Sequence, residues 1–483
     1  MLTPLKRIGL LLLLVSFVFL TGCPPQRPVK KVRKEPPQPQ AEAPKPAAEQ
    51  TPAQAAARPA PQQPAEKPAP AQPAARPAPR PEARPAPPPP PPVPPMTPVE
   101  LEVKALVERF GTERNSYKSS PARAINELSI NTDVLELEDV QLIAKLEGLE
   151  KLSFTDCRDF SDEYTEALLP LKDSLTSLKI GNSRITASSA EIISGFPNIK
   201  ELNLERNTGI GDPACRFFTS MENLEHLNLI YTSLTEIGLL QVRRIPNLKS
   251  LDIRGCTIIA NNGMRNVARI STLKSFQHFS NSVTDEGLAE LTVLENMESL
   301  FLQDFRLTDA AGQSLKKFKN LNSLILFRCG EFGSQGLLEL KGMPLTRLTL
   351  RGLPNLGNDG FEVFREMPAL KRLYLTELDA VSDAAFVPIA ELKNLEILEV
   401  EVMPGVTNEA LKSIAKLQNL RELKLRSVEI TNEGLDEILK LPRLTSLQLL
   451  DNGRIDDVAA REKFAAKNYK TFNIGKTRGD VQE

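Results

Sequence analysis

The chain has 483 residues, and its 60 Lys and Arg almost balance its 61 Asp and Glu. The balance conceals two parts: positions 24–98 carry 11 Lys and Arg against 5 Glu, and Lys6 and Arg7 add two positive charges before them, which leaves −9 for positions 99–483. An acidic folded part argues against a nucleic-acid partner. Two His and no Trp leave few side chains for the common catalytic and metal sites.

Residues 1–22 have the features of a secretion signal. A basic start (Lys6, Arg7) precedes an apolar run of about 13 residues, which suits a signal peptide and is too short to span a bilayer. The run ends in Leu20-Thr21-Gly22-Cys23, which resembles the lipobox of bacterial lipoproteins. The resemblance implies that Cys23 is diacylated after cleavage and anchors the chain to a membrane. A cleaved signal peptide with an incidental Cys is the alternative.

The resemblance also bears on location. In that family an Asp after the lipidated Cys retains the protein in the inner membrane, and Pro24 stands at this position. We therefore expect a bacterial envelope protein, lipid-anchored in the outer membrane and facing the periplasm or the cell surface.

Residues 23–98 form the predicted tether. This stretch holds 28 of the 40 prolines and almost no branched apolar residue, so it cannot bury enough surface to fold and favours polyproline II. At ~3.1 Å per residue it reaches at most ~230 Å. We interpret it as a passive, disordered spacer; weak contact of its Lys and Arg with anionic lipid or cell-wall polymer is the alternative.

From position 125 onward the chain repeats one pattern, L-x-x-L-x-L, at intervals of 24 to 26 positions. Each copy predicts a short strand with one buried face, then a turn, a helix and a Pro-Asn exit. A faint first copy starts at Ile125. The thirteen clear copies start at Leu149, Leu175, Ile199, Leu224, Leu248, Leu273, Met297, Leu321, Leu345, Leu370, Leu395, Leu420 and Leu444.

The turns after the strands identify the type of repeat. They read I-T-N-E-G-L over residues 430–435 and V-T-D-E-G-L over residues 283–288. These segments resemble the I-T-D-x-G-L turn of bacterial leucine-rich repeats, akin to ribonuclease-inhibitor-like repeats. Over residues 125–455 the resemblance implies an α/β solenoid with a curved parallel sheet on its concave face and helices on its convex face. Thr431 is predicted to cap its helix.

The ninth position of each copy is Asn or Cys in this family and bonds the backbone of the turn. Cys157, Cys256 and Cys329 stand there, so the resemblance implies that these thiols are structural. Several copies between residues 305 and 428 have an apolar residue there, which leaves the regularity of their turns open. No two Cys show a zinc or redox spacing.

The ends of the repeat array need covers. Thr97 followed by a helical apolar face up to Phe110 predicts a capped helix, and we expect residues 99–124 to form a helical cap. Residues 456–483 are expected to form a C-terminal cap and tail, with a helix over 456–467 and a last strand over 471–474.

The histidines do not indicate catalysis. His278 occupies an inward strand position and His226 an outward one two copies away, so the two cannot share a site. We interpret His278 as a buried, hydrogen-bonded structural residue. The sequence also has no nucleophile elbow, Walker or dinucleotide motif, and we therefore expect no enzyme, cofactor or metal site.

The outward strand positions give the candidate binding site. They are polar in most copies and become apolar in the middle ones, where arginines follow. In register, Phe301, Ile325, Thr349 and Tyr374 should form one row, and Phe279, Gln303, Phe327 and Arg351 the next. Clustered aromatic residues and Arg are typical of binding hot spots. The predicted site comprises Phe279, Phe301, Ile325, Phe327, Arg347, Arg351, Arg372 and Tyr374; the alternative is that these side chains cover one another.

The leading hypothesis is a lipid-anchored, non-enzymatic scaffold that binds a protein or peptide on its concave face, with no nucleic-acid partner. The alternative is a structural envelope spacer or assembly protein attached to cell-wall material. Related repeats also occur in F-box ubiquitin-ligase adaptors. We do not expect that role, because the region before the repeats is a signal and a coil.

Overall fold

The computed structural model describes residues 95–120 and 123–476. The predictions for residues 1–94, which include Cys23 and nearly all of the tether, lie outside the described residues. Within them, sixteen strands form one sheet in the order β1 to β16, so that neighbours in sequence are neighbours in the sheet. Strands β2 to β16 run parallel, and β1 is antiparallel to β2.

Each repeat contributes one strand and, in nearly every case, one helix. The strands are β1 (Ser116–Ser120), β2 (Arg123–Asn131), β3 (Lys151–Thr155), β4 (Ser177–Gly181), β5 (Glu201–Asn203), β6 (His226–Asn228), β7 (Ser250–Asp252), β8 (Ser275–Phe279), β9 (Ser299–Gln303), β10 (Ser323–Phe327), β11 (Arg347–Arg351), β12 (Arg372–Thr376), β13 (Ile397–Thr407), β14 (Glu422–Glu429), β15 (Ser446–Leu450) and β16 (Thr471–Gly475). The α-helices are α1 (Pro98–Phe110), α2 (Leu137–Ile143), α3 (Asp162–Ala167), α4 (Ala187–Ser194), α5 (Asp212–Phe218), α6 (Glu236–Val242), α7 (Asn261–Val267), α8 (Asp285–Glu290), α9 (Ala311–Leu315), α10 (Ser334–Leu338), α11 (Phe386–Ile389), α12 (Asn408–Ile414), α13 (Leu435–Leu439) and α14 (Asp457–Phe464). The 3₁₀ helices are η1 (Leu169–Leu171), η2 (Leu291–Val293), η3 (Asn358–Glu366) and η4 (Asp383–Ala385).

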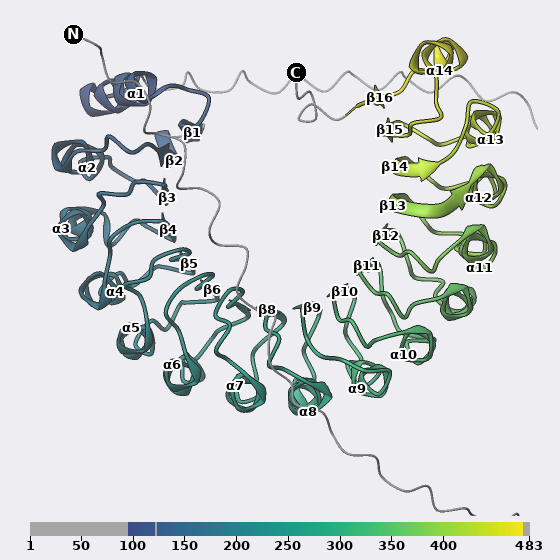
Figure 1. The fold of residues 1–483 in the computed structure, drawn as a ribbon. Coiled ribbons are helices and arrows are strands. Elements are labelled where there is room, and N and C mark those ends of the chain that lie inside the picture. The colour runs from purple at the N-terminus through teal and green to yellow at the C-terminus, as the bar shows by residue number, and fades with distance from the viewer. Residues whose placement is uncertain (1–94, 121–122, 477–483) are drawn as a thin grey trace, which may run out of the picture. The chain divides into compact units, whose positions relative to one another are not determined.

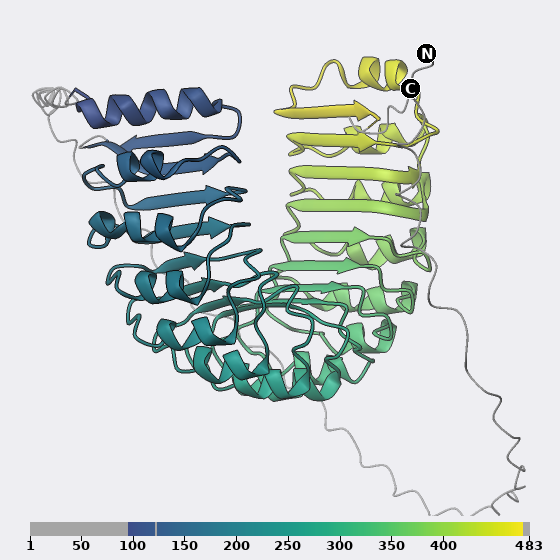
Figure 2. The ribbon, with the colours of Figure 1, turned by 60° about the vertical axis from the view of Figure 1, so that its left-hand side comes forward.

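The strands line the inner side of a curved solenoid and the helices its outer side (Figure 1). Paired strands lie ~4.8 Å apart, whereas a helix needs ~10 Å. Stacked repeats therefore curve, with the strands on the inner side of the curve. The strand side chains that point away from the core line this concave surface. A second view shows the strands stacked rung above rung, with α1 over one end and α14 over the other (Figure 2). No helix of residues 95–120 and 123–476 combines the length and hydropathy that a bilayer crossing requires.

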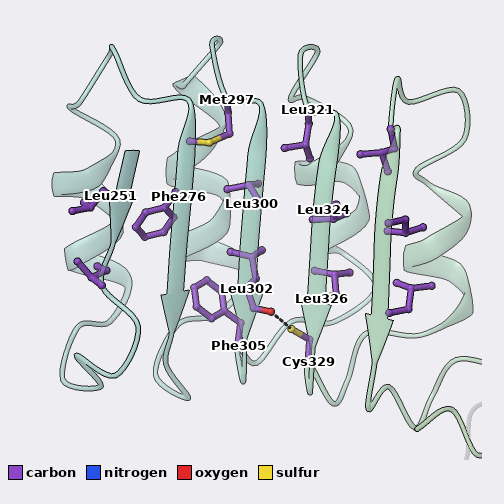
Figure 3. Close-up of a cluster of buried hydrophobic side chains, with 14 of the residues drawn as sticks. Leu251, Phe276, Met297, Leu300, Leu302, Phe305, Leu321, Leu324, Leu326 and Cys329 are labelled. Carbon is purple, nitrogen blue, oxygen red and sulfur yellow. Dashed lines mark hydrogen bonds between the residues drawn. The ribbon is translucent and has the colours of Figure 1, made fainter. Parts of the chain in front are cut away.

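The core consists of leucine rows that run from repeat to repeat. Leu300 and Leu302 of β9 pair with Leu324 and Leu326 of β10, and all four side chains are fully buried (Figure 3). Full burial of one such side chain contributes about 1.5–3 kcal/mol. Because each row is covered only by the next one, a single repeat has no stable core without its neighbours.

Nearly every repeat strand is followed by a left-handed turn. The eighth residue of twelve of the thirteen clear copies has a positive φ, including Val402 (φ 52°) and Gly255 (φ 81°). Where the ninth residue is a buried Cys or Asn, it donates to a backbone carbonyl of the preceding repeat, as Cys329 Sγ does to Leu302 O at 3.7 Å (Figure 3). The predicted structural role of Cys157, Cys256 and Cys329 is confirmed. The turns between residues 305 and 428 are regular although apolar residues stand at several ninth positions.

The copy that starts at Leu273 is the exception, and His278 stabilises it. Its eighth residue, Ser280, lacks the positive φ, and its ninth, Asn281, is exposed. The carbonyl of Ile253 lies 3.2 Å from Nδ1 of His278 instead, and Ser280 Oγ donates to Ile259 O at 2.9 Å. Burial lowers the pKa of His278 to about 4, so the imidazole is neutral at pH 7. The prediction of a buried, hydrogen-bonded histidine is confirmed.

A ladder of side-chain acceptors, which we call the carboxylate ladder, ties most helix starts to the next, with Asn in place of Asp or Glu in several copies. Asp212 Oδ1 accepts from the backbone N–H of Thr235 (2.8 Å) and of Gly238 (2.9 Å), while Thr235 Oγ1 donates to Oδ2 (2.6 Å). A Cβ at Gly238 would lie 2.5 Å from this oxygen, which explains the Gly of the turn motif. The prediction that Thr431 caps its helix is wrong: α13 begins at Leu435, and Thr431 Oγ1 accepts from Asn408 Nδ2 (2.8 Å).

Both ends carry caps, and the N-terminal one differs from the expectation. Thr97 caps α1 through a reciprocal capping box with Glu100. Residues 99–124 are not only helical, however, because β1 pairs antiparallel with β2. The sequence Ser116-Tyr-Lys-Ser-Ser120 has no apolar alternation, so the periodicity did not indicate this edge strand. At the other end α14 and β16 occupy the predicted positions.

Candidate binding surface

The register of the sheet brings the predicted site residues together. Phe301, Ile325, Thr349 and Tyr374 are direct neighbours on β9 to β12, and the row of Phe279, Gln303, Phe327 and Arg351 runs beside it. Arg347 and Arg372 pair in a third row. The predicted rows are therefore confirmed, on the concave side of the solenoid. We call the eight predicted site residues the central patch.

The aromatic side chains of the central patch are half-buried rather than bare. Arginines stack on them: the guanidinium of Arg254 lies 5.0 Å from the ring centre of Phe301, and those of Arg328 and Arg351 lie 4.5 and 4.4 Å from Phe327. Arg347 lies 5.0 Å from the ring of Tyr374. Such cation–π contacts contribute about 0.5–2 kcal/mol each. Rings and guanidinium groups therefore stack on one another across this surface. The alternative that the side chains cover one another holds only in part, because the rings stay half-exposed.

Most of these arginines are also neutralised. Arg254 forms a bidentate pair with Asp252, in which Nε donates to Oδ1 (3.0 Å) and Nη2 to Oδ2 (2.7 Å). Arg328 pairs with Asp304 at 2.6 Å and Arg351 with Glu377 at 2.9 Å. In the described part of the chain, Arg347 and Arg372 have no such partner, and Nε of Arg347 is buried without a hydrogen bond.

Comparison with known proteins adds to this geometry. The family model described as "Leucine Rich repeat" matches residues 244–268, which span the end of one repeat and most of the next. The fold is a leucine-rich-repeat solenoid. The strand order of the described residues and this match both support the assignment. None of the curated proteins compared with the chain matches it.

Several solved structures are similar to the solenoid. An internalin from Listeria monocytogenes is 15% identical with a TM-score of 0.43, and the match covers 78% of this chain and 94% of that one. A chain of the Rad7 and Elc1 complex from yeast is 18% identical with a TM-score of 0.49, over 74% and 84%. A chain of the mouse RP105/MD-1 complex is 18% identical with a TM-score of 0.44, over 67% and 59%. We draw nothing on ligands from these likenesses.

The N-terminal half of the concave face is polar. Two open hollows lie there, one over β1 to β4 and one over β4 to β8. In the second, Asn203 and Asn228 accept the backbone N–H two residues ahead (3.0 and 2.9 Å). This local hydrogen bond ends the strand early, which explains why β5 and β6 have only three residues. The amide oxygens of Asn203 and Asn228 thus already accept a hydrogen bond. The aromatic residues of the concave face lie further along the solenoid, on β8 to β12.

The sequence analysis missed one row of candidate residues. Ser275, Ser299 and Ser323 are adjacent at the first position of β8, β9 and β10, and the next residue in this row is Arg347. Ser250 of β7 begins the row. The four hydroxyls, which we call the serine row, make no side-chain hydrogen bond with other described residues. The recurrence of Ser at the same position of four consecutive repeats is present in the sequence. It does not stand out there, because Ser is common at polar positions.

The buried cysteines of the described residues are not activated. Burial raises the pKa of Cys157 to about 11 and of Cys215 and Cys329 to about 12. These thiols are therefore protonated at neutral pH and are poor nucleophiles and metal ligands. Residues 95–120 and 123–476 contain no group of three His, Cys, Asp or Glu side chains placed to hold a metal ion.

Proposed function

We propose that this protein is a non-enzymatic recognition scaffold that binds a protein or peptide on the concave face of its solenoid. The observation that carries the proposal is the central patch, in which half-buried rings and arginines from β8 to β12 gather on the concave face. Aromatic residues and Arg dominate binding hot spots. The patch spans about five strands, or ~20 Å, which suits a polypeptide segment better than a small molecule.

We further propose that the scaffold is tethered to a bacterial envelope membrane through a lipidated Cys23. The lipobox-like Leu20-Thr21-Gly22-Cys23 supports the anchor, and the proline-rich residues 24–98 support a long spacer. A reach of up to ~230 Å would let the concave face search well away from the membrane. The outer membrane is favoured because Pro24 follows the cysteine.

The binding role is tested by removing the aromatic surface. In the variant Phe301→Ser/Phe327→Ser, with the fold checked by circular dichroism, capture of partners from solubilised envelopes should fall at least tenfold. Ile237→Ser/Leu240→Ser is the matched control, because these apolar side chains are exposed (68% and 40%) on α6 of the convex side. Unchanged capture by the concave variant would overturn the proposal.

The anchor is tested separately. Cys23→Ala should abolish incorporation of labelled palmitate and release the protein from membranes. A protein without residues 1–94, which keeps the Thr97 cap of α1, should still bind the partner if the solenoid is the recognition element. If the truncated protein binds no partner whereas the full chain does, the alternative of a structural spacer attached through its tether replaces the scaffold proposal.

A further inference from the structure

Two neighbouring arginines on the concave face lack the partners that the other basic residues have. The outward strand positions of the thirteen clear copies, which line this face, carry eight Lys or Arg side chains. Six of them form ion pairs: Lys151, Lys179, Arg254, Arg351, Lys424 and Arg426. Arg347 and Arg372, which we call the arginine pair, form none and make no side-chain hydrogen bond with a described residue.

The arginine pair is held in place without a close ion pair, although the Glu399 carboxylate lies near enough to attract Arg347 electrostatically. The two residues face each other across β11 and β12, about 4.8 Å apart at the backbone. Arg347 is half-buried against the ring of Tyr374 (5.0 Å), and its Nε is inaccessible to water. A guanidinium whose donors are neither paired nor fully hydrated favours an anionic acceptor. Arg372 is exposed and adds a second fork at the same point.

The surroundings of the arginine pair differ on its two sides. Toward the C-terminus lie Glu399, which pairs with Lys424 at 3.8 Å, and Glu422. These carboxylates would repel a second anion. Toward the N-terminus lie the uncharged serine row and the apolar side chains of Phe301 and Ile325.

We propose that the arginine pair reads an acidic side chain of an extended peptide, whose next apolar side chain lies over Phe301 and Ile325. This inference rests on the proposed function and specifies the ligand of the same surface. The peptide would cross the strands from β12 toward β9, with the serine hydroxyls available to its backbone carbonyls. The carboxylates of Glu399 and Glu422 would repel an acidic residue placed over β13 and β14. The acidic residue of the peptide therefore lies over β11 and β12.

The geometry also sets a spacing. Ile325 lies one strand and two residues away from Arg347, which corresponds to roughly 8 Å. An extended peptide advances ~3.3 Å per residue. Because alternate side chains of an extended peptide face the same side, the recognised segment contains Asp or Glu about two positions away from a large apolar residue.

The test is selection from a random twelve-residue peptide display library on the purified full chain. Peptides selected by the unmodified chain should be enriched in Asp or Glu at this spacing from an apolar residue. On Arg347→Gln/Arg372→Gln the acidic enrichment should vanish, and a selected peptide should bind about ten- to a hundredfold more weakly. The matched control Arg244→Gln/Arg269→Gln removes two charges beyond α6 and α7 and should change neither.

Charge reversal provides a readout that loss of packing cannot imitate. Arg347→Glu/Arg372→Glu should select Lys and Arg at the position where the unmodified chain selects Asp and Glu. This inference is overturned if the selected peptides are not enriched in Asp or Glu. It is also overturned if the preference for acidic residues persists in both the Gln and the Glu variants of the arginine pair. Either result leaves the scaffold proposal standing. If phosphatidylglycerol vesicles, and no acidic peptide, depend on the arginine pair, the ligand is a lipid and the inference is wrong. If no peptide binds in a way that depends on Phe301 and Phe327, the proposed function itself fails.

Discussion

His278 should make the solenoid sensitive to mild acid, and His278→Leu should remove most of this sensitivity. The imidazole is fully buried between β7 and β9, where Nδ1 lies 3.2 Å from Ile253 O, Nε2 lies 3.3 Å from Ile259 O and the ring of Phe305 packs edge-on at 5.7 Å. Burial penalises the imidazolium and lowers the pKa to about 4 from an ordinary value of 6.5. The folded protein therefore resists a proton that the unfolded chain accepts readily.

The sign and size of the effect follow from this difference. At pH 7.5 the histidine is almost entirely neutral in both states and its contribution to stability is complete. As the pH falls from there to 4, the unfolded chain gains a proton first, so the free energy of unfolding falls by at most about 1.4 kcal/mol per pH unit. The expected loss is about 2 kcal/mol at pH 5 relative to pH 7.5 and about 3 kcal/mol in total.

Urea unfolding followed by far-UV circular dichroism at pH 7.5 and 5.0 measures this loss, since the chain has no Trp to report by fluorescence. Titration of the carboxylates affects both proteins, so the difference between the unmodified chain and His278→Leu isolates the histidine. That difference should be about 2 kcal/mol. His226→Gln, which removes the exposed histidine, should behave like the unmodified chain. Equal acid sensitivity of the chain and His278→Leu would refute the reasoning.

Two further predictions concern the ladders. Asp383→Ala removes the acceptor of Thr407 N (2.7 Å), Thr407 Oγ1 (2.7 Å) and Ala410 N (3.1 Å) and should lower the free energy of unfolding by about 1–3 kcal/mol. Asp379→Ala, at an exposed position without a side-chain hydrogen bond or ion pair to the described residues, should leave it unchanged; equal losses would mean that the carboxylate ladder contributes nothing. Cys157, Cys215, Cys256 and Cys329 are buried with raised pKa values, so a thiol reagent should label them only after denaturation. Rapid labelling of the native protein at any of these four positions, located by mass spectrometry, would contradict this.

The sequence determined the fold because one period governs it. Leucines that recur once per repeat set the strand positions, and parallel pairing without slippage then sets every row. The same arithmetic predicted that Phe301 and Tyr374 would share a row. Wherever a feature depends on repeat position alone, the periodicity was sufficient.

Features that depend on contacts between side chains were not predictable in this way. The edge strand β1 has no apolar signal, and the eighth position of the His278 copy looks like any other in the sequence. Nor does the sequence show which arginine stacks or pairs. Arg254 reaches the ring of Phe301 two strands away, whereas Arg347 remains without a partner. These outcomes depend on side-chain reach and local curvature, which a one-dimensional pattern does not contain.

Site-specific photo-crosslinking in intact cells tests most directly whether the concave face is the recognition surface. A photo-reactive phenylalanine analogue in place of Gln303, which lies between Phe279 and Phe327, should yield a discrete adduct of protein or peptide mass. The same analogue in place of Ile237, exposed on the convex side, should yield none. An adduct formed from position 237 but not from position 303 would contradict the account.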